Sequence, residues 1–201
     1  MRLSTVTLLC ASLVVVGLVA AAPPPKAPRN QNKKSETYTI DNAHSIALFR
    51  VKHLGVSNFY GHFNDMSGAF TLDPEDPGNN SVSIEVKAAS VATHDNKRDQ
   101  HLTSTDFFSA KEFPIISFKS TEVEEAGDKK FKVTGDFTMH GKTKSITVEV
   151  EQVGAANVMG GHRAGFETTF TISRKDFGMN TMPEGIGDEV RIAVSVEGLR
   201  K

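Results

Sequence analysis

The stretch FKVTGDFTMHGKTKSITVEVE, residues 131–151, carries the pattern that decides the fold. Apolar residues share one parity in two runs that flank the turn sequence HGKTK: Phe131, Val133, Phe137 and Met139, then Ile146, Val148 and Val150. Polar residues fill the positions between them. Strict alternation of this kind is typical of strands with one buried and one solvated face. The stretch therefore predicts an antiparallel hairpin.

The same period of two recurs on both sides of this hairpin. The apolar members are Val82, Ile84, Val86 and Ala88, then Phe166, Phe170 and Ile172 in parity with Thr168, then Val190, Ile192, Val194 and Val196. Turn-forming stretches at 73–80, 125–130 and 183–189 separate the runs. About seven or eight antiparallel strands are indicated, which predicts an all-β barrel or sandwich.

The amino-acid composition narrows the range of possible functions. The 24 acidic and 23 basic side chains leave a formal charge of -1, without the basic face that nucleic-acid binding requires. Phenylalanine is abundant, with 13 Phe against 2 Tyr and no Trp. Buried Phe needs no hydrogen-bond partner, whereas buried Tyr and Trp usually do. We therefore expect a large, dry interior and no nucleic-acid partner.

The N-terminus predicts export. Arg2 is the only charged residue before a nearly continuous apolar run from Val6 to Ala22. A short basic start, an apolar stretch and small residues at its end match a signal peptide, residues 1–21, cleaved after Ala21. An uncleaved anchor is the alternative, but the run is short for spanning roughly 30 Å of hydrocarbon. We expect a periplasmic or otherwise extracytoplasmic protein.

Residues 22–36 are rich in Pro, Lys and Asn and have no apolar period, which predicts a disordered leader before a single domain at 37–201. Cleavage would remove Cys10, the only cysteine. The mature chain would then have no disulfide, no thiolate nucleophile and no cysteine ligand for a metal.

The stretch RDQHLTSTDFFSAKEFPIISF, residues 98–118, breaks the alternation. We expect Thr93 or Asp95 to cap a short helix, and Ser104 or Thr105 a second one. Pro114 should end this excursion before a strand resumes. Its apolar cluster needs something apolar to cover, so we expect the segment to close one mouth of a barrel.

Motifs for catalysis and metals are weak. The seven histidines include no pair closer than His94 and His101, and no HExxH is present, although a site assembled in space stays open. There is no GxSxG elbow, phosphate loop or dinucleotide motif. We predict no catalytic residue, no metal and no cofactor. Arg98 and Asp99 could either anchor a ligand head group or fix the lid by a structural contact.

Several stretches resemble one known family. They are HSIALFRVKHLGVSNFYGHFNDMSGAFTLD at 44–73, Arg98-Asp99 and His101-Leu102, Asp106-Phe107-Phe108, Phe113-Pro114, the hairpin at 133–150, SRKDFGMN at 173–180 and GDEVRIAVSVEG at 187–198. In this order, over about 38–199, the chain resembles the YceI-like family of exported lipid-binding proteins. Phe137 and Met139 stand where that family more often has Leu.

The resemblance implies an eight-stranded antiparallel lipocalin-like barrel with a short helical segment near one end. It also implies a long apolar ligand, such as a polyisoprenoid, an isoprenoid quinone or a fatty derivative, and no shared catalysis. A barrel of this size either fills with side chains or holds one small ligand. A closed barrel without ligand and an enzyme acting on an isoprenoid remain the alternatives. Contact with a membrane and a homodimer are also left open.

Candidate ligand-binding residues follow from parity and from this resemblance. We expect the tunnel wall to contain Phe49, Phe70, Ile84, Val86, Phe118, Phe137, Met139, Phe166, Phe170 and Val194. Phe107 and Phe108 would close or shape one mouth. Arg98, His101 or Arg174 would meet a polar head group.

Overall fold

The computed structural model describes residues 35–158 and 160–200, so the predicted signal peptide and nearly all of the predicted leader lie outside the described residues. The strands are β1 (Glu36–Ile40), β2 (Ile46–His53), β3 (Ser57–Phe63), β4 (Met66–Leu72), β5 (Ser81–Lys87), β6 (Val91–Ala92), β7 (Ile115–Gly127), β8 (Lys130–Met139), β9 (Lys142–Val158), β10 (Gly161–Ser173) and β11 (Ile186–Arg200). One α-helix, α1 (Asn96–Thr103), and four 3-10 helices complete the described part: η1 (Asn42–His44), η2 (Pro77–Asn79), η3 (Ala88–Ser90) and η4 (Arg174–Phe177).

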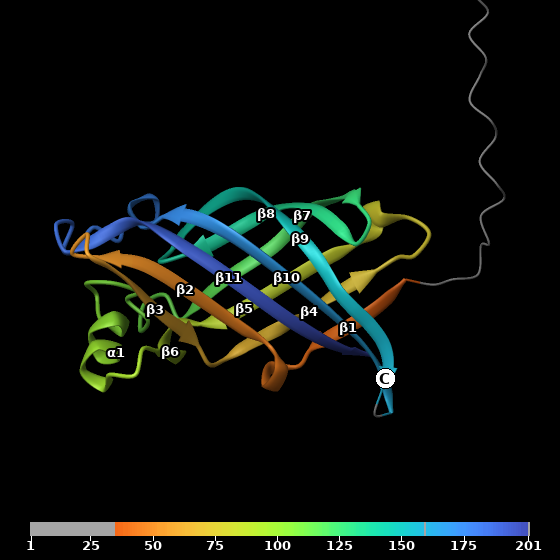
Figure 1. The fold of residues 1–201 in the computed structure, drawn as a ribbon, viewed down its shortest axis with the longest axis horizontal. Helices are drawn as coiled ribbons and strands as arrows, with labels where there is room; N and C mark the ends of the chain where they lie inside the picture. The colour runs from red at the N-terminus through yellow and green to blue at the C-terminus, as the bar shows by residue number, and fades with distance from the viewer. Residues whose placement is uncertain (1–34, 159, 201) are drawn as a thin grey trace, which may run out of the picture. The chain divides into compact units, whose positions relative to one another are not determined.

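These eleven strands follow eight paths through one antiparallel sheet (Figure 1). β1 and β2 both pair with β11, so they are two parts of one interrupted strand. β4 and β3 lie beside them in the same way, and β5 and β6 come next. The pairing of β1 with β11 closes the ring. The predicted eight-stranded antiparallel barrel is confirmed.

The alternation expected from the sequence sets which side chains point inward. In β8, Val133, Phe137 and Met139 are buried, whereas Lys132 is exposed. Gly135 occupies the inward position where this apolar run is interrupted. A Cβ atom there would lie 2.6 Å from Cζ of Phe118 and 2.5 Å from the carbonyl oxygen of residue 119, which is far inside van der Waals contact. The Phe118 ring therefore takes the space that a side chain at 135 would need.

The excursion between β6 and β7 contains a single helix. Asp95 caps α1, its carboxylate accepting a hydrogen bond from the Arg98 amide at 2.9 Å. The predicted second helix at Ser104 or Thr105 is wrong, because residues 104–113 form successive turns. Ser104 instead ends α1: its backbone is extended, and its hydroxyl donates to the His101 carbonyl at 2.7 Å. As predicted, the strand resumes directly after Pro114.

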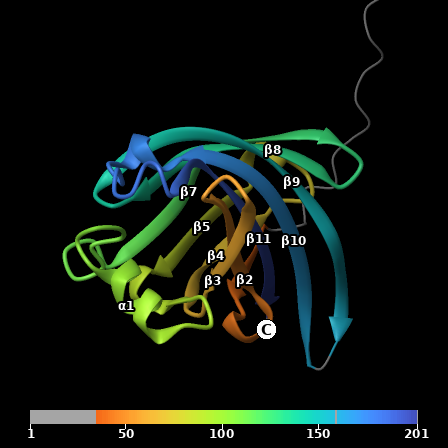
Figure 2. The same cartoon turned by 60° about the vertical axis from the view of Figure 1, so that its left-hand side comes forward.

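The up-and-down path of the chain collects four connections at one end of the barrel. These are the β2–β3 turn, the segment 93–114 with α1, the β8–β9 turn and the segment 174–185 (Figures 1 and 2). We call this the helix end. Within the described part of the chain, no helix is both long and apolar enough to cross a bilayer.

Candidate functional site

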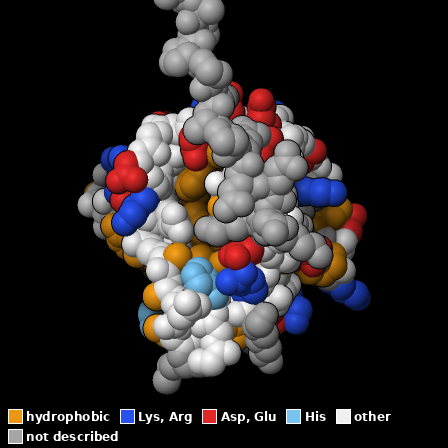
Figure 3. Space-filling view, turned by 90° about the vertical axis from the view of Figure 1, so that its right-hand side faces the viewer, with side chains coloured by type: hydrophobic (Ala, Val, Ile, Leu, Met, Phe, Trp, Pro, Cys, Tyr) orange, Lys and Arg blue, Asp and Glu red, His pale blue; other side chains and the backbone are white. Residues whose placement is uncertain are grey.

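The barrel is hollow. A cavity of about 490 Å³ runs inside it, walled by side chains from the inner faces of the strands and from α1 and the turns that follow it. Phe137 lies toward the helix end of the wall, where it contacts Phe177 of η4, and Leu72 and Val82 extend the apolar lining toward the end opposite α1. That end faces the viewer in Figure 3, where hydrophobic side chains are visible between the charged side chains around them. The interior is therefore apolar along most of its length.

All ten residues predicted for the tunnel wall lie in the lining: Phe49, Phe70, Ile84, Val86, Phe118, Phe137, Met139, Phe166, Phe170 and Val194. Several of their rings contact one another edge-on, as in Phe70 with Phe166 at 5.1 Å and Phe137 with Phe170 at 6.0 Å between centroids. Such aromatic pairs add stability beyond the area they bury. Their role in binding a ligand stays a prediction.

The two phenylalanines predicted to cover a mouth lie at the helix end of the same cavity. Phe108 packs edge-on against Phe63, with ring centroids 5.3 Å apart. Phe107 is buried and lies edge-on to the His101 ring at 5.0 Å. The cover therefore rests on the wall through the Phe108–Phe63 contact, while Phe107 packs within the cover itself.

Arg98 and Asp99 fix this cover through Thr93, which is buried. Arg98 donates from Nε to the Thr93 hydroxyl at 2.8 Å and from Nη2 to the Thr93 carbonyl, and that hydroxyl donates to the Asp99 carboxylate. The Arg98 guanidinium also lies 4.4 Å above the Phe59 ring, a cation–π geometry. Of the two roles left open by the sequence, the geometry supports the structural contact.

His101 is tied down in a similar way. Its Nε2 lies 2.8 Å from a carboxylate oxygen of Asp106, with both side chains about half exposed, at 47% and 56%. The contact joins α1 to the turn that follows it. His101 still lines the cavity, so a head-group contact stays a prediction for its ring.

Arg174 is buried at the helix end, with 3% of its surface exposed. It donates to three backbone carbonyls, those of Met179 at 2.7 Å, Ile186 at 3.0 Å and Gly187 at 3.0 Å. Burial lowers the pKa of its guanidinium. The side chain therefore holds the segment 178–187 in place, and its predicted contact with a head group would rely on the N–H groups that remain.

Sequence reasoning did not single out Tyr38, which packs against the lining residue Phe70 from outside the lining, or Met182, which lines the cavity. Tyr38 is almost fully buried and stacks on Phe70 with centroids 5.0 Å apart. Its hydroxyl donates to Glu36 at 2.9 Å and lies 2.8 Å from Nδ1 of His162, and burial is the main cause that raises its pKa to about 12. Met182 belongs to the lining from an irregular segment. Tyr38 shares parity with Ile40 and could have been found, whereas no sequence period marks Met182.

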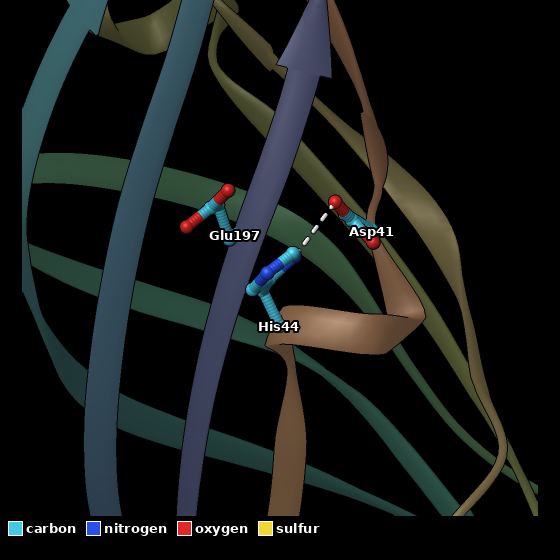
Figure 4. Close-up of side chains that lie close together, drawn as sticks. All are labelled: Asp41, His44 and Glu197. Carbon is cyan, nitrogen blue, oxygen red and sulfur yellow. Dashed lines mark hydrogen bonds and ion pairs between the residues drawn. The ribbon is translucent and has the colours of Figure 1, made fainter. Parts of the chain in front are cut away.

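Three side chains of types that can coordinate a metal ion lie close together outside the cavity: Asp41, His44 and Glu197 (Figure 4). Asp41 accepts from His44 Nδ1 at 3.0 Å and from Arg163 at 2.9 Å, and Arg163 also pairs with Glu197. The Arg163 hydrogen bond is the main cause that lowers the pKa of Asp41 to about 2. Because the Arg163 guanidinium already pairs with both carboxylates, we assign no metal to this cluster.

Comparison with known proteins gives consistent relationships. A family model described as YceI-like domain matches residues 38–198. A UPF0312 protein of Pseudomonas paraeruginosa is 41% identical over 167 residues, which covers 82% of this chain and 87% of that protein.

Two solved structures share the fold. BcnA of Burkholderia cenocepacia superimposes with a TM-score of 0.71 at 26% identity, over 79% of this chain and 98% of its own. A polyisoprenoid binding domain from Saccharophagus degradans gives a TM-score of 0.65 at 14% identity, over 82% and 98% of the two chains. At that identity, the second match speaks for the fold alone.

Proposed function

The chain belongs to the YceI-like family, and from this premise we propose that it is an exported carrier that holds one long-chain apolar lipid inside its barrel. The chemical class is a polyisoprenoid, an isoprenoid quinone or a fatty derivative. One observation carries the proposal: the apolar cavity of about 490 Å³ that runs inside the barrel.

The size of this cavity fits a ligand. Pockets that enclose small molecules usually measure about 300–1,000 Å³. Burial of one methylene contributes about 0.8 kcal/mol, so about ten methylenes would contribute about 8 kcal/mol before the entropic cost of binding. A barrel filled by its own side chains would leave no such space, which weighs against the ligand-free structural module.

The Saccharophagus degradans domain provides a precedent, since its name says that it binds polyisoprenoids within the same fold. We propose no enzymatic activity for this chain. The charged lining side chains Arg98, His101 and Arg174 are each hydrogen-bonded to neighbouring protein groups, which supports a structural role for them.

Export is the second part of the proposal, and it rests on the apolar run from Val6 to Ala22. N-terminal sequencing of the protein recovered from the extracytoplasmic fraction tests it. A mature chain that begins at Ala22 would support cleavage after Ala21. An intact Met1 in a membrane fraction would show that the run is retained as an anchor.

Native mass spectrometry of protein purified without detergent tests the carrier function, followed by organic extraction of whatever is bound. We expect a stoichiometric excess mass that extracts as a prenyl chain, a quinone or a fatty derivative. A bare protein mass that also fails to take up added prenyl chains, quinones and fatty amides would overturn the proposal.

A further inference from the structure

Three large apolar side chains protrude at the helix end: Leu54, Val56 and Met182, which are 60%, 83% and 52% exposed. We call them the loop tip. The first two belong to the β2–β3 turn, and Met182 belongs to the segment between η4 and β11 (left in Figure 1). The Leu54 amide donates to the Gly185 carbonyl at 2.8 Å, which holds the two loops together.

The backbone makes this exposure more informative. Leu54 has a φ of 52° and Met182 a φ of 53°. Gly, Asn and Asp accept this left-handed conformation best, and a bulky side chain there is uncommon. At each of these two positions the chain thus carries an apolar residue for which both the left-handed backbone conformation and the exposure to water are unfavourable. A local conflict of this kind is expected where a surface has a function.

The loop tip is continuous with the cavity. Met182 is exposed at the tip and also lines the cavity, together with His53, the last residue of β2, and Ile186, the first residue of β11. Apolar surface therefore runs from the outside of the helix end into the barrel. A lipid that enters along it would stay in contact with apolar side chains.

Charge and size favour one kind of docking partner. The exposed charged residues nearest to the tip in sequence are Lys52 and Glu184, one of each sign, so together they give the tip no net charge. A stable protein interface buries about 800 Å² on each partner, which is much more than three protruding side chains provide. Binding at a bilayer surface scales with the apolar area that is inserted, so a small group of protruding apolar side chains suits shallow, reversible insertion below lipid headgroups.

We propose that the loop tip docks on the surface of a lipid bilayer and that the cargo lipid passes between the bilayer and the cavity beside it. This inference rests on the proposed carrier function and adds the surface at which the exchange occurs. It assigns Leu54 and Val56, which do not line the cavity, to docking rather than to holding the lipid.

The absence of tryptophan from the chain allows a local test. We would introduce Val56→Trp, or Val153→Trp as the control, into protein purified without detergent in the form that cells produce. Val153 is 61% exposed on β9, away from the helix end. With phosphatidylcholine vesicles, we expect a blue shift and quenching by bromolipids for Val56→Trp alone. An equal response from both reporters, or none from Val56→Trp, would overturn the proposal.

A binding measurement complements the reporters. We expect Leu54→Asp/Val56→Asp to reduce the vesicle-bound fraction at least about tenfold, and the control Val153→Asp/Val158→Asp to leave it unchanged. Asp is accepted at the positive φ of residue 54, and residues 56, 153 and 158 are exposed, so both variants should fold. Raising the salt concentration should not release the protein, because salt screens charge attraction and not apolar insertion.

Native mass spectrometry of the same variants separates the two proposals. Both proposals stand if the wild-type protein and Leu54→Asp/Val56→Asp retain equal amounts of bound lipid and only the variant fails to bind vesicles. Lipid retention without any vesicle contact would overturn bilayer docking and leave the tip as a site for a protein partner. Vesicle contact by a protein that retains no lipid would overturn the carrier function alone.

Discussion

The hairpin β8–β9 and the segment 93–114 line one cavity, but they are held in place by different means. The hairpin pairs without interruption from Lys130 with Glu151 to Met139 with Lys142. In the segment, α1 has no fully buried residue, and contacts around Thr93 and Phe108 hold it against the wall. Continuous backbone hydrogen bonds hold the wall in place, and its inward side chains add packing. The cover is held by a few individual contacts, so the loss of any one of these contacts should loosen it.

The largest expected effect is in the wall. Phe137→Asp would place a carboxylate among the rings of Phe170 and Phe177, at a position that is 6% exposed. We expect the free energy of unfolding to fall by about 4 kcal/mol or more, and lipid retention to be lost. Chemical denaturation and native mass spectrometry measure the two effects.

Phe137→Leu is the matched control, since it keeps the position apolar. It should retain both the fold and the lipid at a cost of about 1 kcal/mol. A folded Phe137→Asp protein with wild-type lipid content would show that this face of β8 does not hold the ligand.

A smaller effect is expected where the wall is closest-packed. Gly135→Ala would bring a methyl group into the Phe118 ring and the backbone of β7. We expect the free energy of unfolding to fall by about 1–3 kcal/mol, as measured by thermal or chemical denaturation. Gly154→Ala on β9 is the control, because an added Cβ atom meets nothing within 4 Å there. Equal losses in both variants would mean that general strand propensity, and not the Phe118 contact, sets the cost.

The cover should respond in ligand kinetics more than in stability. Thr93→Val keeps the side-chain shape but removes the hydroxyl that joins Arg98 to Asp99. We expect the free energy of unfolding to fall by about 1–2 kcal/mol and bound lipid to be released faster. Stopped-flow transfer of a fluorescent fatty acid to acceptor vesicles measures the release. Thr105→Val, at an exposed position, should change neither quantity; unchanged release in Thr93→Val would show that the cover does not limit exit.

The smallest effect concerns neither wall nor cover but the junction of β1 with β11. The folded state holds the pKa of Asp41 at about 2, below its ordinary value of 3.8, mainly through the Arg163 hydrogen bond. The ionised carboxylate therefore stabilises the fold above its ordinary pKa, and this stabilisation is lost as the pH falls toward about 2. The free energy of unfolding, measured by denaturation between about pH 5 and about pH 2, should fall less steeply with falling pH in Asp41→Asn than in the wild-type protein. A slope equal to that of the wild-type protein would assign the acid sensitivity to other groups.

The sequence anticipated the wall better than its ends. Phe131 to Val150 alternate because each strand has one face on the core, and a period of two needs no knowledge of the tertiary structure. The second helix expected at Ser104 was wrong because the same residue type that begins a helix can also end one. Arg98 and Arg174 were recognised as important, but their hydrogen-bond partners come from positions that no local pattern relates to them.

By itself, the sequence determined the antiparallel all-β architecture, the inward face of each regular strand and the segment that covers one end. Alternation is a local property, so it survives without coordinates. Only the tertiary structure decided that the barrel is hollow, since filled and empty barrels share one pattern and differ in how far apart the closed walls stand. It also decided that Leu54, Val56 and Met182 meet beside the cavity, because two loops more than a hundred residues apart come together only when the ring of strands is complete.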